Sequence, residues 1–588
     1  MLRPRRESHP SLSVLRPVLM LAAALAAPMT QAATPSSGTV SSTSSSITYS
    51  AGPFLVPNAS ATAGTLSCNA LSPCDDFKLS VSVPAGYEAD HTLSIKVSWS
   101  NTAADFDLYV LDATGAVLST AASQSNPETV LLPARAGNYT LRAVPFLPLG
   151  SSLSATASLQ ALPPPPPVSQ FPAAAYDTFT APEALNRRDQ AGEPSIGANW
   201  KTGVALYQSN LSTYRVSFND TSQPATATWL EKSSSTAVVS LDPILFTDSV
   251  TGRTFESQLA GKASLMSYSD GDGESWLPSM GSGINSGVDH QTVGGGPFSK
   301  NGPLGVLGPL TSYPHAVYYC SQDIADASCA LSRDGGLTFG VAVPMYSLLQ
   351  CGGLHGHVKV APDGTVYVPN KGCNGQQGVA VSTDNGLTWS VRTVPGSLAG
   401  ESDPSVGIGA DGTVYFGYQN ANGHPRVAVS RDQGLTWSDD QDVGYALGIQ
   451  NVVFPAVVAG DADRAAFAFI GTPSGGNYQD AANFQGAWHL YVAHTYDGGK
   501  TWKTTDTTPN DPVQRGSICT GGTTCGNDRN LLDFMDITVD REGRVLVGYA
   551  DGCVGACVQG GANSFSQVAT IARQSGGERL FRTPRPVP

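Results

Sequence analysis

Acidic residues stand just before short apolar runs at several places in the chain. Glu193, Asp242 and Asp403 each precede a proline, in the segments GEPSIGAN, LDPILFTD and SDPSVGIGADG. Asp289 opens the similar segment VDHQTVGG, and His355 lies as far before the turn PDG as Asp403 lies before ADG. Carboxylates that are brought together repel one another, so at least one gains a raised pKa and can act as a general acid. One protonated and one ionised carboxyl group are what glycosidic cleavage requires.

We therefore predict that Glu193, Asp289, Asp403 and His355 are catalytic. Other polar residues lie near the same rim or near the first inner strand and are predicted to bind substrate: Asp242, His290, His357, Glu401, Arg529, Asp533 and Arg188. The alternative is structural, because each carboxylate could instead cap backbone amides or bond to a neighbouring repeat. Oxygen ligands around an axis would suit Ca²⁺. No cofactor is required by the predicted chemistry, and no metal ligands can be assigned.

A repeated turn indicates which elements position these residues. Clean copies of the pattern S/T-x-D-x-G-x-T-W/F occupy residues 332–339, 382–389, 430–437 and 495–502, and residues 269–276 form a degenerate copy. The Asp can accept backbone N–H bonds inside the turn, the Gly tolerates a positive φ, and the aromatic residue packs between sheets. Alternating segments such as GTVYVPN and GTVYFGY separate the copies. A period of about 50 residues with four short strands predicts the blades of a β-propeller.

This turn resembles the Asp box of the bacterial neuraminidase repeat, over roughly residues 185–575. The resemblance implies a sialidase-like propeller in which the turn joins the third and fourth strands of a blade, away from the substrate face. It therefore implies structural roles for the acids of the turns: Asp334, Asp384, Asp432 and Asp497. Sialidases bind the substrate carboxylate with three arginines, the first in an Arg-Ile-Pro motif, whereas this chain has NRRDQAGEPSIG at that place. The resemblance thus carries the fold and leaves the sialidase active site unassigned.

The number of blades follows from the aromatic residues that close the candidate turns. Six are present: Trp229, Trp276, Phe339, Trp389, Trp437 and Trp502. The segments NLLDFMDITVDREGRVLVGYADGC and SQVATIARQ supply strands for one more blade without such a turn. We therefore expect seven blades, with six as the alternative, and we predict that YDTFTAPEAL completes the last one. The predicted fold class is all-β, a propeller preceded by a small β-sandwich.

The sandwich is predicted from alternating segments between residues 47 and 162, such as FKLSVSVPAG and HTLSIKVSWS, which turn residues separate. Two of its segments, DFDLYVLDATG and AGNYTLRAV, resemble the bacterial pre-peptidase C-terminal domain family. That resemblance implies an accessory module of secreted enzymes. The remaining predicted parts are a signal peptide over 1–32, a Ser/Thr-rich spacer over 33–46, a Pro-rich linker over 163–175 and the propeller over 176–588.

The N-terminus and the cysteines both indicate export. MLRPRR, the apolar run VLMLAAALAA and the small residues of MTQAA form a signal-peptide pattern with cleavage near Ala32 or Ala33. Ten cysteines in close pairs predict five disulfides: Cys68–Cys74, Cys320–Cys329, Cys351–Cys373, Cys519–Cys525 and Cys553–Cys557. We expect a secreted or periplasmic monomer without a membrane span.

Three functions remain open on these grounds. The first is a secreted glycan-cleaving hydrolase of sialidase-like fold, the second a propeller that binds glycan or protein without catalysis, and the third a polysaccharide lyase with a histidine base. Acidic residues outnumber basic ones by 47 to 33, giving a net charge of −14, which argues against nucleic acid as a partner. We expect a glycan or polysaccharide partner and favour the hydrolase.

Overall fold

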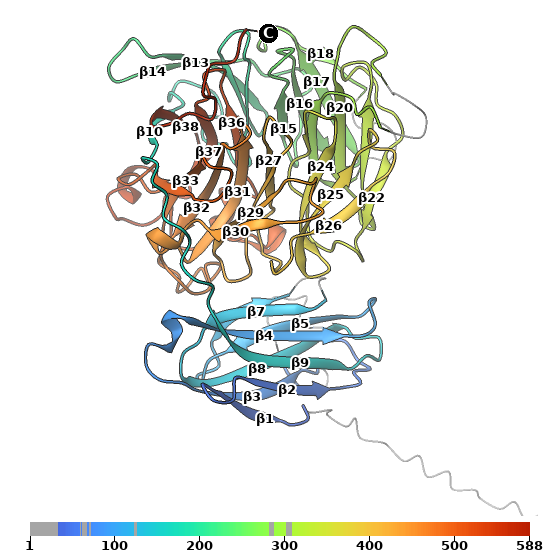
Figure 1. Cartoon of the computed structure of the whole chain (residues 1–588), viewed down its shortest axis with the longest axis vertical. Coiled ribbons are helices and arrows are strands. Elements are labelled where there is room, and N and C mark those ends of the chain that lie inside the picture. Colours follow the sequence, from blue (N-terminus) through green and yellow to red (C-terminus); the bar gives the residue numbers. More distant parts are fainter. Residues whose placement is uncertain are drawn as a thin grey trace, which may run out of the picture.

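The structure, a computed structural model, describes residues 33–587 apart from residues 59, 61–66, 70–71, 123–125, 281–286 and 302–307. The predicted signal peptide lies outside this part of the chain. Strands form two bodies, a small one below a larger one in Figure 1. The helices are short 3-10 turns: η2 (Tyr87–Ala89), η3 (Tyr445–Leu447), η4 (Gly522–Thr524), η5 (Asn527–Arg529) and η6 (Gly555–Cys557). No helix of the described residues is long and apolar enough to cross a membrane.

The smaller body is a sandwich of two sheets. One sheet has the order β1 (Ser37–Ser41), β3 (Asp75–Ser82), β8 (Gly137–Leu147), β5 (Asp105–Leu111) and β6 (Val117–Ala121). The other has the order β2 (Ser46–Ala51), β9 (Leu153–Ala161), β4 (His91–Trp99) and β7 (Glu128–Pro133). Buried and exposed residues alternate along the strands, so that Phe77 and Leu79 of one sheet pack with Ile95 and Val97 of the other. This alternation is what a two-layer β core requires.

The prediction that residues 33–46 are only a Ser/Thr-rich spacer is wrong, because this segment contains strand β1. β1 pairs in parallel with β3, from Ser37 opposite Lys78 to Ser41 opposite Ser82. Val40 is fully buried in the sandwich core. The low hydrophobicity of the segment hid the strand, since an edge strand held by backbone hydrogen bonds can contribute a single apolar residue to the core.

Seven sheets follow one another in the larger body and form the blades of the propeller. Given from the inner strand outward, the first three are blade 1, β11 (Ser195–Ala198), β12 (Ala205–Ser209), β13 (Ser212–Asn219) and β14 (Thr226–Glu231); blade 2, β15 (Ile244–Thr247), β16 (Thr254–Ala260), β17 (Ala263–Ser269) and β18 (Leu277–Pro278); and blade 3, β19 (Asp289–Gly296), β20 (Ala316–Gln322), β21 (Asp326–Ser332) and β22 (Val343–Ser347). The next two are blade 4, β23 (Lys359–Val360), β24 (Val366–Cys373), β25 (Gln376–Ser382) and β26 (Ser390–Thr393); and blade 5, β27 (Ser405–Ile408), β28 (Val414–Gln419), β29 (Pro425–Ser430) and β30 (Ser438–Asp442). The last two are blade 6, β31 (Asn451–Ala459), β32 (Ala465–Thr472), β33 (Ala487–Thr495) and β34 (Lys503–Asp506), with β35 (Gln514–Arg515) also on β33; and blade 7, β36 (Asp536–Val539), β37 (Val545–Asp551), β38 (Val568–Gly576) and β10 (Ala175–Thr180).

The seven blades form a closed ring, as favoured from the sequence. The inner strands β11, β15, β19, β23, β27, β31 and β36 contact one another in that order, and β36 contacts β11. β10 comes before blade 1 in the chain but pairs antiparallel with β38 as the outer strand of blade 7. The segment YDTFTAPEAL therefore completes the last blade, as predicted, and joins the two ends of the propeller.

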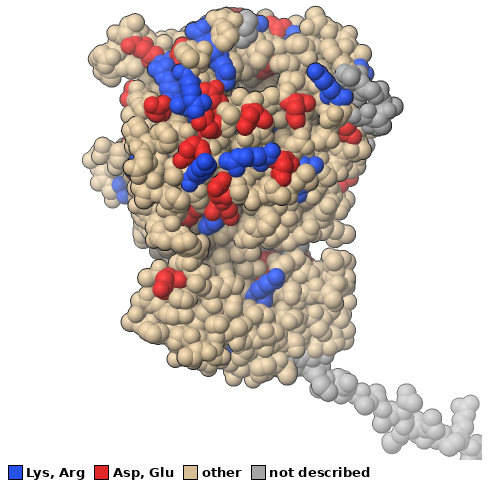
Figure 2. All heavy atoms as spheres, viewed as in Figure 1, with Lys and Arg blue, Asp and Glu red and all other residues tan. Residues whose placement is uncertain are grey.

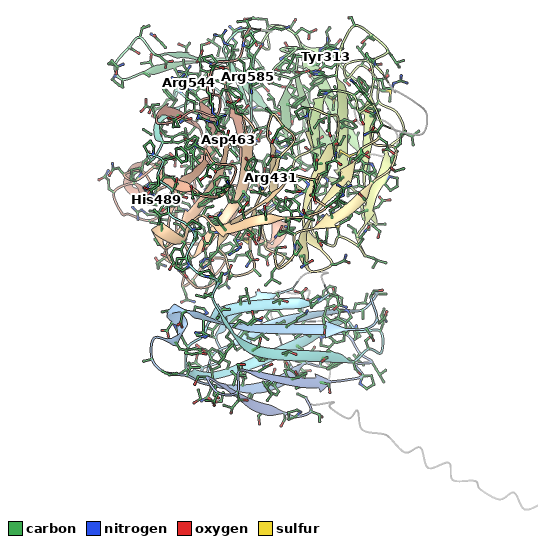
Figure 3. The ribbon with its side chains drawn as sticks, viewed as in Figure 1. Tyr313, Arg431, Asp463, His489, Arg544 and Arg585 are labelled. Carbon is green, nitrogen blue, oxygen red and sulfur yellow. A yellow bond between two sulfur atoms is a disulfide. The ribbon has the colours of Figure 1, made fainter. Side chains whose placement is uncertain are left out.

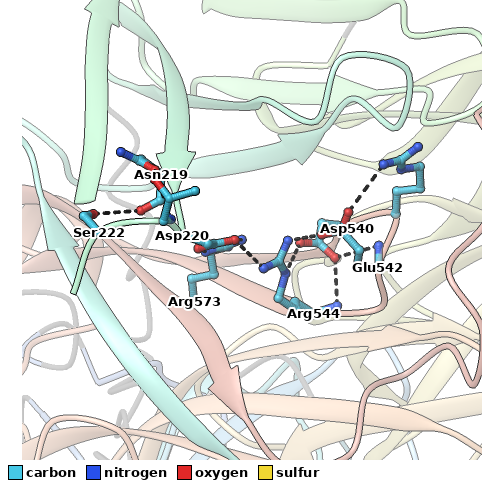
Figure 4. A network of polar contacts seen from close by, with 9 residues as sticks. Asn219, Asp220, Ser222, Asp540, Glu542, Arg544 and Arg573 are labelled. Atoms are coloured by element: carbon cyan, nitrogen blue, oxygen red, sulfur yellow. Dashed lines mark hydrogen bonds and ion pairs between the residues drawn. The ribbon is translucent and has the colours of Figure 1, made fainter. Parts of the chain in front are cut away.

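Side chains also cross the seam between blades 7 and 1. Phe179 of β10 is 7% exposed and packs edge to face on Phe218 of β13, with ring centroids 5.1 Å apart. Arg573 of β38 donates to both carboxylate oxygens of Asp220 at 2.6 and 2.9 Å, and Arg544 donates to Asp220 at 2.7 Å (Figure 4). Hydrogen bonds from Arg573 and then Arg544 hold the pKa of Asp220 below its usual range.

Opposite charges are interspersed on the propeller. Acidic and basic side chains lie next to one another there in Figure 2, whereas the sandwich shows few charges in the same view. Arg544, Arg585, Asp463 and Arg431 belong to this pattern (Figure 3), and Arg585 donates to Asp461 at 2.9 Å. Such mixed charge gives no single-sign field for a polyanion on this face.

Each clean copy of the repeated turn joins the third and fourth strands of its blade with one set of hydrogen bonds. In blade 4, Ser382 Oγ donates to Asp384 Oδ1 at 2.9 Å, and the N–H of Gly386 donates to Ser382 Oγ at 2.9 Å. Thr388 donates its N–H and its hydroxyl to the two Asp384 oxygens at 2.9 and 2.6 Å. The same bonds recur around Asp334, Asp432 and Asp497. These acids hold the turns and lie at the opposite end of the blades from the starts of the inner strands.

All five predicted disulfides are present: Cys68–Cys74, Cys320–Cys329, Cys351–Cys373, Cys519–Cys525 and Cys553–Cys557. Each closes a short segment of chain, and the described residues contain no free cysteine. Disulfides of this density suit an oxidising compartment.

Substitution of Phe179 by alanine should lower the free energy of unfolding by about 3 kcal/mol, because it removes a buried ring from the seam that closes the propeller. Denaturant-induced unfolding measures this loss. Phe146→Ala makes the same change at a ring that is 39% exposed, and should cost less than about 1 kcal/mol. An equally small loss for Phe179→Ala would contradict the importance of the seam.

Candidate functional site

The predicted acidic residues lie where the inner strands begin. Glu193, Asp242 and Asp403 each stand two residues before an inner strand, namely β11, β15 and β27. Asp289 and Asp536 are the first residues of β19 and β36. Because the inner strands run around one axis, these side chains converge at one end of it.

At three of the seven inner strands, a residue other than glycine adopts the left-handed backbone conformation in or just before the strand. Glu193 has φ 55°, His290 has φ 47° and Phe454, in β31, has φ 58°. Such conformations cost on the order of 1–3 kcal/mol each and persist where the surrounding structure enforces them. Their recurrence in blades 1, 3 and 6 indicates that the ring sets the backbone here, against local preference.

A cavity of about 20 Å³ lies on the axis among these residues. Its lining includes Asp242, His290, His355, His357, Asp403, Phe534 and Asp536. That space holds a water molecule and is too small for a sugar ring. Asp242, His290 and His355 are 5%, 7% and 3% exposed. The sequence suggested an open mouth, and the structure instead buries these groups below the surface.

Asp403 lies where the cavity meets the outer rim. Its Oδ2 is 3.5 Å from His290 Nε2, and its Oδ1 is 3.1 Å from Lys371 Nζ. Burial alone would lower the pKa of His290, but Asp403 and Asp242 raise it. Burial would likewise lower the pKa of Lys371, and Asp403 outweighs that effect. His290 and the Lys371 ammonium group therefore flank the carboxyl group of Asp403.

Two other carboxyl groups have raised pKa values. Burial raises the pKa of Asp242 to about 7; the charges of Asp289 and Asp533 add to this effect, and His290 opposes it. Burial, followed by Asp242 and Asp533, raises the pKa of Glu193 well above its usual range. Glu193 is 3% exposed, and its Oε2 is buried without a hydrogen-bond partner. At neutral pH the site therefore holds carboxyl groups that can donate a proton.

His355 supplies a neutral acceptor. Its Nδ1 lies 3.0 Å from the carbonyl oxygen of Gly356, so Nδ1 carries the proton and Nε2 keeps its lone pair. Nε2 is buried without a hydrogen-bond partner. Burial, with the charge of His290 as a second cause, lowers the pKa of His355 to about 4. The His290 and His355 rings lie edge to face, with centroids 6.2 Å apart.

Arg529 anchors the opposite side of the rim. It donates to both carboxylate oxygens of Asp533 at 2.6 Å, and the proximity of Asp533 contributes to the raised pKa of Glu193. The Arg529 side chain is 22% exposed, so a cation remains accessible above the buried carboxyl groups.

Some of the carboxylates also have the structural role that the sequence left open. Asp242 Oδ2 accepts the N–H of Gln291 at 3.1 Å, from blade 3. Asp536 Oδ2 accepts the N–H of Ile196 at 3.1 Å, from blade 1. Both acids therefore link the inner strands of adjacent blades, which fixes their position in the site.

A cleft of about 950 Å³ separates the sandwich from the same end of the propeller. Residues of the sandwich edge strands β6 and β7 line one side, and loops of blades 4, 5 and 6 line the other. The sandwich lies below these blades in Figure 1. Lys371 and Glu401 line the cleft, and Lys371 is the residue that contacts Asp403 of the axial cavity. Lys371 therefore lies between the cleft and the residues of the cavity. The volume of the cleft lies within the range of about 300–1,000 Å³ typical of ligand sites.

The other predicted residues take different places. Asp289 and Glu401 are exposed on the rim. His357 Nδ1 lies 3.7 Å from Asp536 Oδ1. The guanidinium of Arg188 donates to the carbonyl of Ala181 at 2.9 Å and lies 3.7 Å from Glu183, so its contacts are outside the axial group.

Sequence reasoning missed Lys371. It lies near the end of β24, the second strand of blade 4. The second strands end at the same end of the propeller at which the inner strands begin, so a search of those strand ends for charged residues would have found it. Among the residues that the structure describes, no group of three or more His, Cys, Asp or Glu is arranged to hold a metal ion, and we propose no calcium site.

Comparisons with known proteins add only distant likenesses. No protein-family profile matches the chain, and no curated protein matches it. The chain is similar in structure to the NanB sialidase of Streptococcus pneumoniae, with a TM-score of 0.33, 11% identity, and coverage of 82% of this chain and 94% of that one. Its similarity to the intramolecular trans-sialidase of Ruminococcus gnavus has a TM-score of 0.33, 12% identity and coverage of 66% and 96%. Its similarity to the six-bladed Aleuria aurantia lectin has a TM-score of 0.34, 13% identity and coverage of 54% of this chain and 95% of that one.

Asp242→Asn should stabilise the protein at alkaline pH. The carboxyl group has a pKa of about 7 in the folded protein and about 4 when unfolded, so its ionisation destabilises the fold as pH rises through this window. The amide avoids that loss and can still accept the Gln291 N–H. We expect a gain of about 4 kcal/mol at pH 8 that disappears near pH 4, measured by denaturant unfolding.

Asp536→Asn is the matched comparison with the opposite sign. Burial would raise the pKa of Asp536, but Lys359, His357 and the Ile196 N–H lower it instead. Its charge therefore stabilises the fold at neutral pH and the effect is lost as pH falls. We expect Asp536→Asn to destabilise the protein at pH 7 and not under acidic conditions; parallel pH profiles for the two variants would contradict this electrostatic description.

Proposed function

We propose that the protein is a glycan-cleaving hydrolase whose reaction takes place at the rim of the propeller, above the axial cavity and beside the cleft. One observation carries the proposal: Asp242, whose pKa is about 7, and Asp403, flanked by His290 and Lys371, line the same cavity. A carboxyl group that stays protonated near neutral pH can serve as the general acid of a hydrolytic site, and a second carboxyl group in the same space can serve as the base.

The reaction would use these two groups in opposite roles. Asp242 protonates the glycosidic oxygen as the bond from that oxygen to the anomeric carbon breaks, while Asp403 accepts a proton from the attacking water. The cavity of about 20 Å³ has room for that water. Direct attack by a bound water inverts the configuration of the anomeric carbon. Glu193, through Asp533, and the neutral His355 would keep these groups oriented.

The substrate would lie above the cavity and extend into the cleft. Lys371 and Arg529 are 19% and 22% exposed, and they offer cations to an acidic sugar at the rim. Asp289 and Glu401 are the exposed acids beside them. Further sugar residues would occupy the cleft between the sandwich and blades 4 to 6. An acidic glycan longer than one residue therefore fits the site best.

Binding without cleavage is the second candidate, and the burial of the carboxyl groups favours it. A protein that only binds glycan needs the exposed rim and the cleft, and its buried acids would serve to join adjacent blades, as Asp242 and Asp536 do.

A product screen on acidic and neutral oligosaccharides separates the two. The hydrolase proposal predicts that Asp242→Asn and Asp403→Asn each lower kcat by at least about 100-fold, and that Lys371→Ala chiefly raises KM for the acidic substrates. Asp363→Asn, in the hairpin between the first two strands of blade 4 at the opposite end, is the matched control and should leave activity unchanged.

The form of the product tests the mechanism further. A product of inverted configuration, followed by NMR immediately after cleavage, is expected. An unsaturated product would indicate a lyase instead. Binding of acidic glycan that persists in both acid variants, without any product from the native protein, would overturn the hydrolase in favour of the binder.

A further inference from the structure

The described chain begins with a residue that is already part of the sandwich core. Ala33 is 5% exposed and packs within that core. Thr34 exchanges backbone hydrogen bonds with Ser50 at 2.8 and 3.2 Å. Ala33 directly follows Ala32, where the small-residue pattern of MTQAA allows cleavage.

The backbone nitrogen of Ala33 faces a buried acid. Asp75, the first residue of β3, is 2% exposed, and its Oδ1 accepts the Ala33 N–H at 2.7 Å. The second oxygen, Oδ2, is buried without a hydrogen-bond partner. The neighbouring Arg142 is bound to Asp76 at 2.7 and 2.8 Å. A buried carboxylate with an unused oxygen requires a cation or a further donor.

We propose that the chain is cut between Ala32 and Ala33 and that the new α-ammonium group of Ala33 forms a buried ion pair with Asp75. In this hydrolysis a peptidase adds water across the amide bond. Ala32 leaves with a carboxylate, and Ala33 gains the ammonium group. That group has three N–H donors in place of one, so it can satisfy Oδ2 as well as Oδ1.

The position of the cut matters because the nitrogen atom itself makes the contact. A cut after Ala33 would remove both the donor and the buried methyl group, and would leave Asp75 unpaired in the core. A cut before Ala32 would leave an amide at position 33, which has a single N–H. Only the bond between Ala32 and Ala33 yields the ion pair, so the geometry chooses between the two cleavage sites that the sequence allows.

The pair would make sandwich stability depend on processing and on pH. In the uncut chain, burial followed by the charge of Asp76 raises the pKa of Asp75, to about 6, against the Ala33 N–H bond, which lowers it. Ionisation of Asp75 then destabilises the uncut protein as pH rises from about 4 to 6. Tyr49, the other titratable group beside Asp75, stays neutral in this range. In the cut chain the ammonium lowers the pKa of Asp75, so the advantage of the cut form grows as pH rises through this window.

The experiment has two parts. First, the protein exported with its own leader is purified and its N-terminus is determined by intact mass and N-terminal sequencing, with Ala33 expected. Second, chains that run from a free amine at Ala33 to Pro588, or that carry one glycine before Ala33, are compared with and without Asp75→Asn. The comparison uses thermal unfolding at pH 7.5 and hydrogen exchange of β1 and β3.

The added glycine should lower the melting temperature of the Asp75 protein by about 10 °C and speed exchange in β1 and β3. In the Asp75→Asn background the same glycine should shift the melting temperature by less than about 2 °C, because there is no charge to pair. Asp76→Asn is the matched control and should keep the full effect of the glycine. A mature N-terminus other than Ala33, or equal glycine effects in the Asp75 and Asp75→Asn proteins, would overturn the proposal.

Discussion

The closed ring of seven inner strands is the constraint on which the axial site depends. The pairing of β10 with β38 and the contact of Phe179 with Phe218 fasten its two ends, so the first side chains of the inner strands cannot move apart. Carboxyl groups then share a space with room for a water molecule, where burial and mutual repulsion favour their protonated forms. Lys371 and Arg529 place cations at the rim beside Asp403 and Asp533, and the raised pKa values of Asp242 and Glu193 follow from the architecture.

The fold was largely readable from the sequence because the repeated turn is local. Its Asp, Gly and Thr make hydrogen bonds within a few residues, as at Asp384, so pattern and structure agree. His355 lies as many residues before the turn PDG as Asp403 lies before ADG, and this spacing predicted that the two residues lie together. Burial depth was not readable, because it depends on packing between blades far apart in sequence. Lys371 and strand β1 were missed for the same reason: Lys371 acts from β24, the second strand of its blade, and β1 is held by pairing with β3.

Stability and chemistry oppose each other at Asp242. Its backbone contact with Gln291 helps to join blades 2 and 3, yet its burial makes ionisation costly. A protein selected for stability alone would place an amide there. The strained backbone at Glu193 and His290 points in the same direction. The sandwich lies over the same end of the ring, so the cleft is bounded by both bodies, and its lining includes Lys371, which contacts Asp403.

The most direct test of this account is the protonation state of Asp242 in the folded protein. Infrared difference spectra between the native protein and Asp242→Asn, recorded as a pH titration, isolate the carbonyl band of a protonated carboxyl group. We predict that the band is present at pH 6 and disappears with a midpoint near 7, in line with a pKa of about 7. A carboxylate already ionised at pH 6, with a midpoint near the ordinary value of about 4, would contradict the proposed division of the site into acid and base.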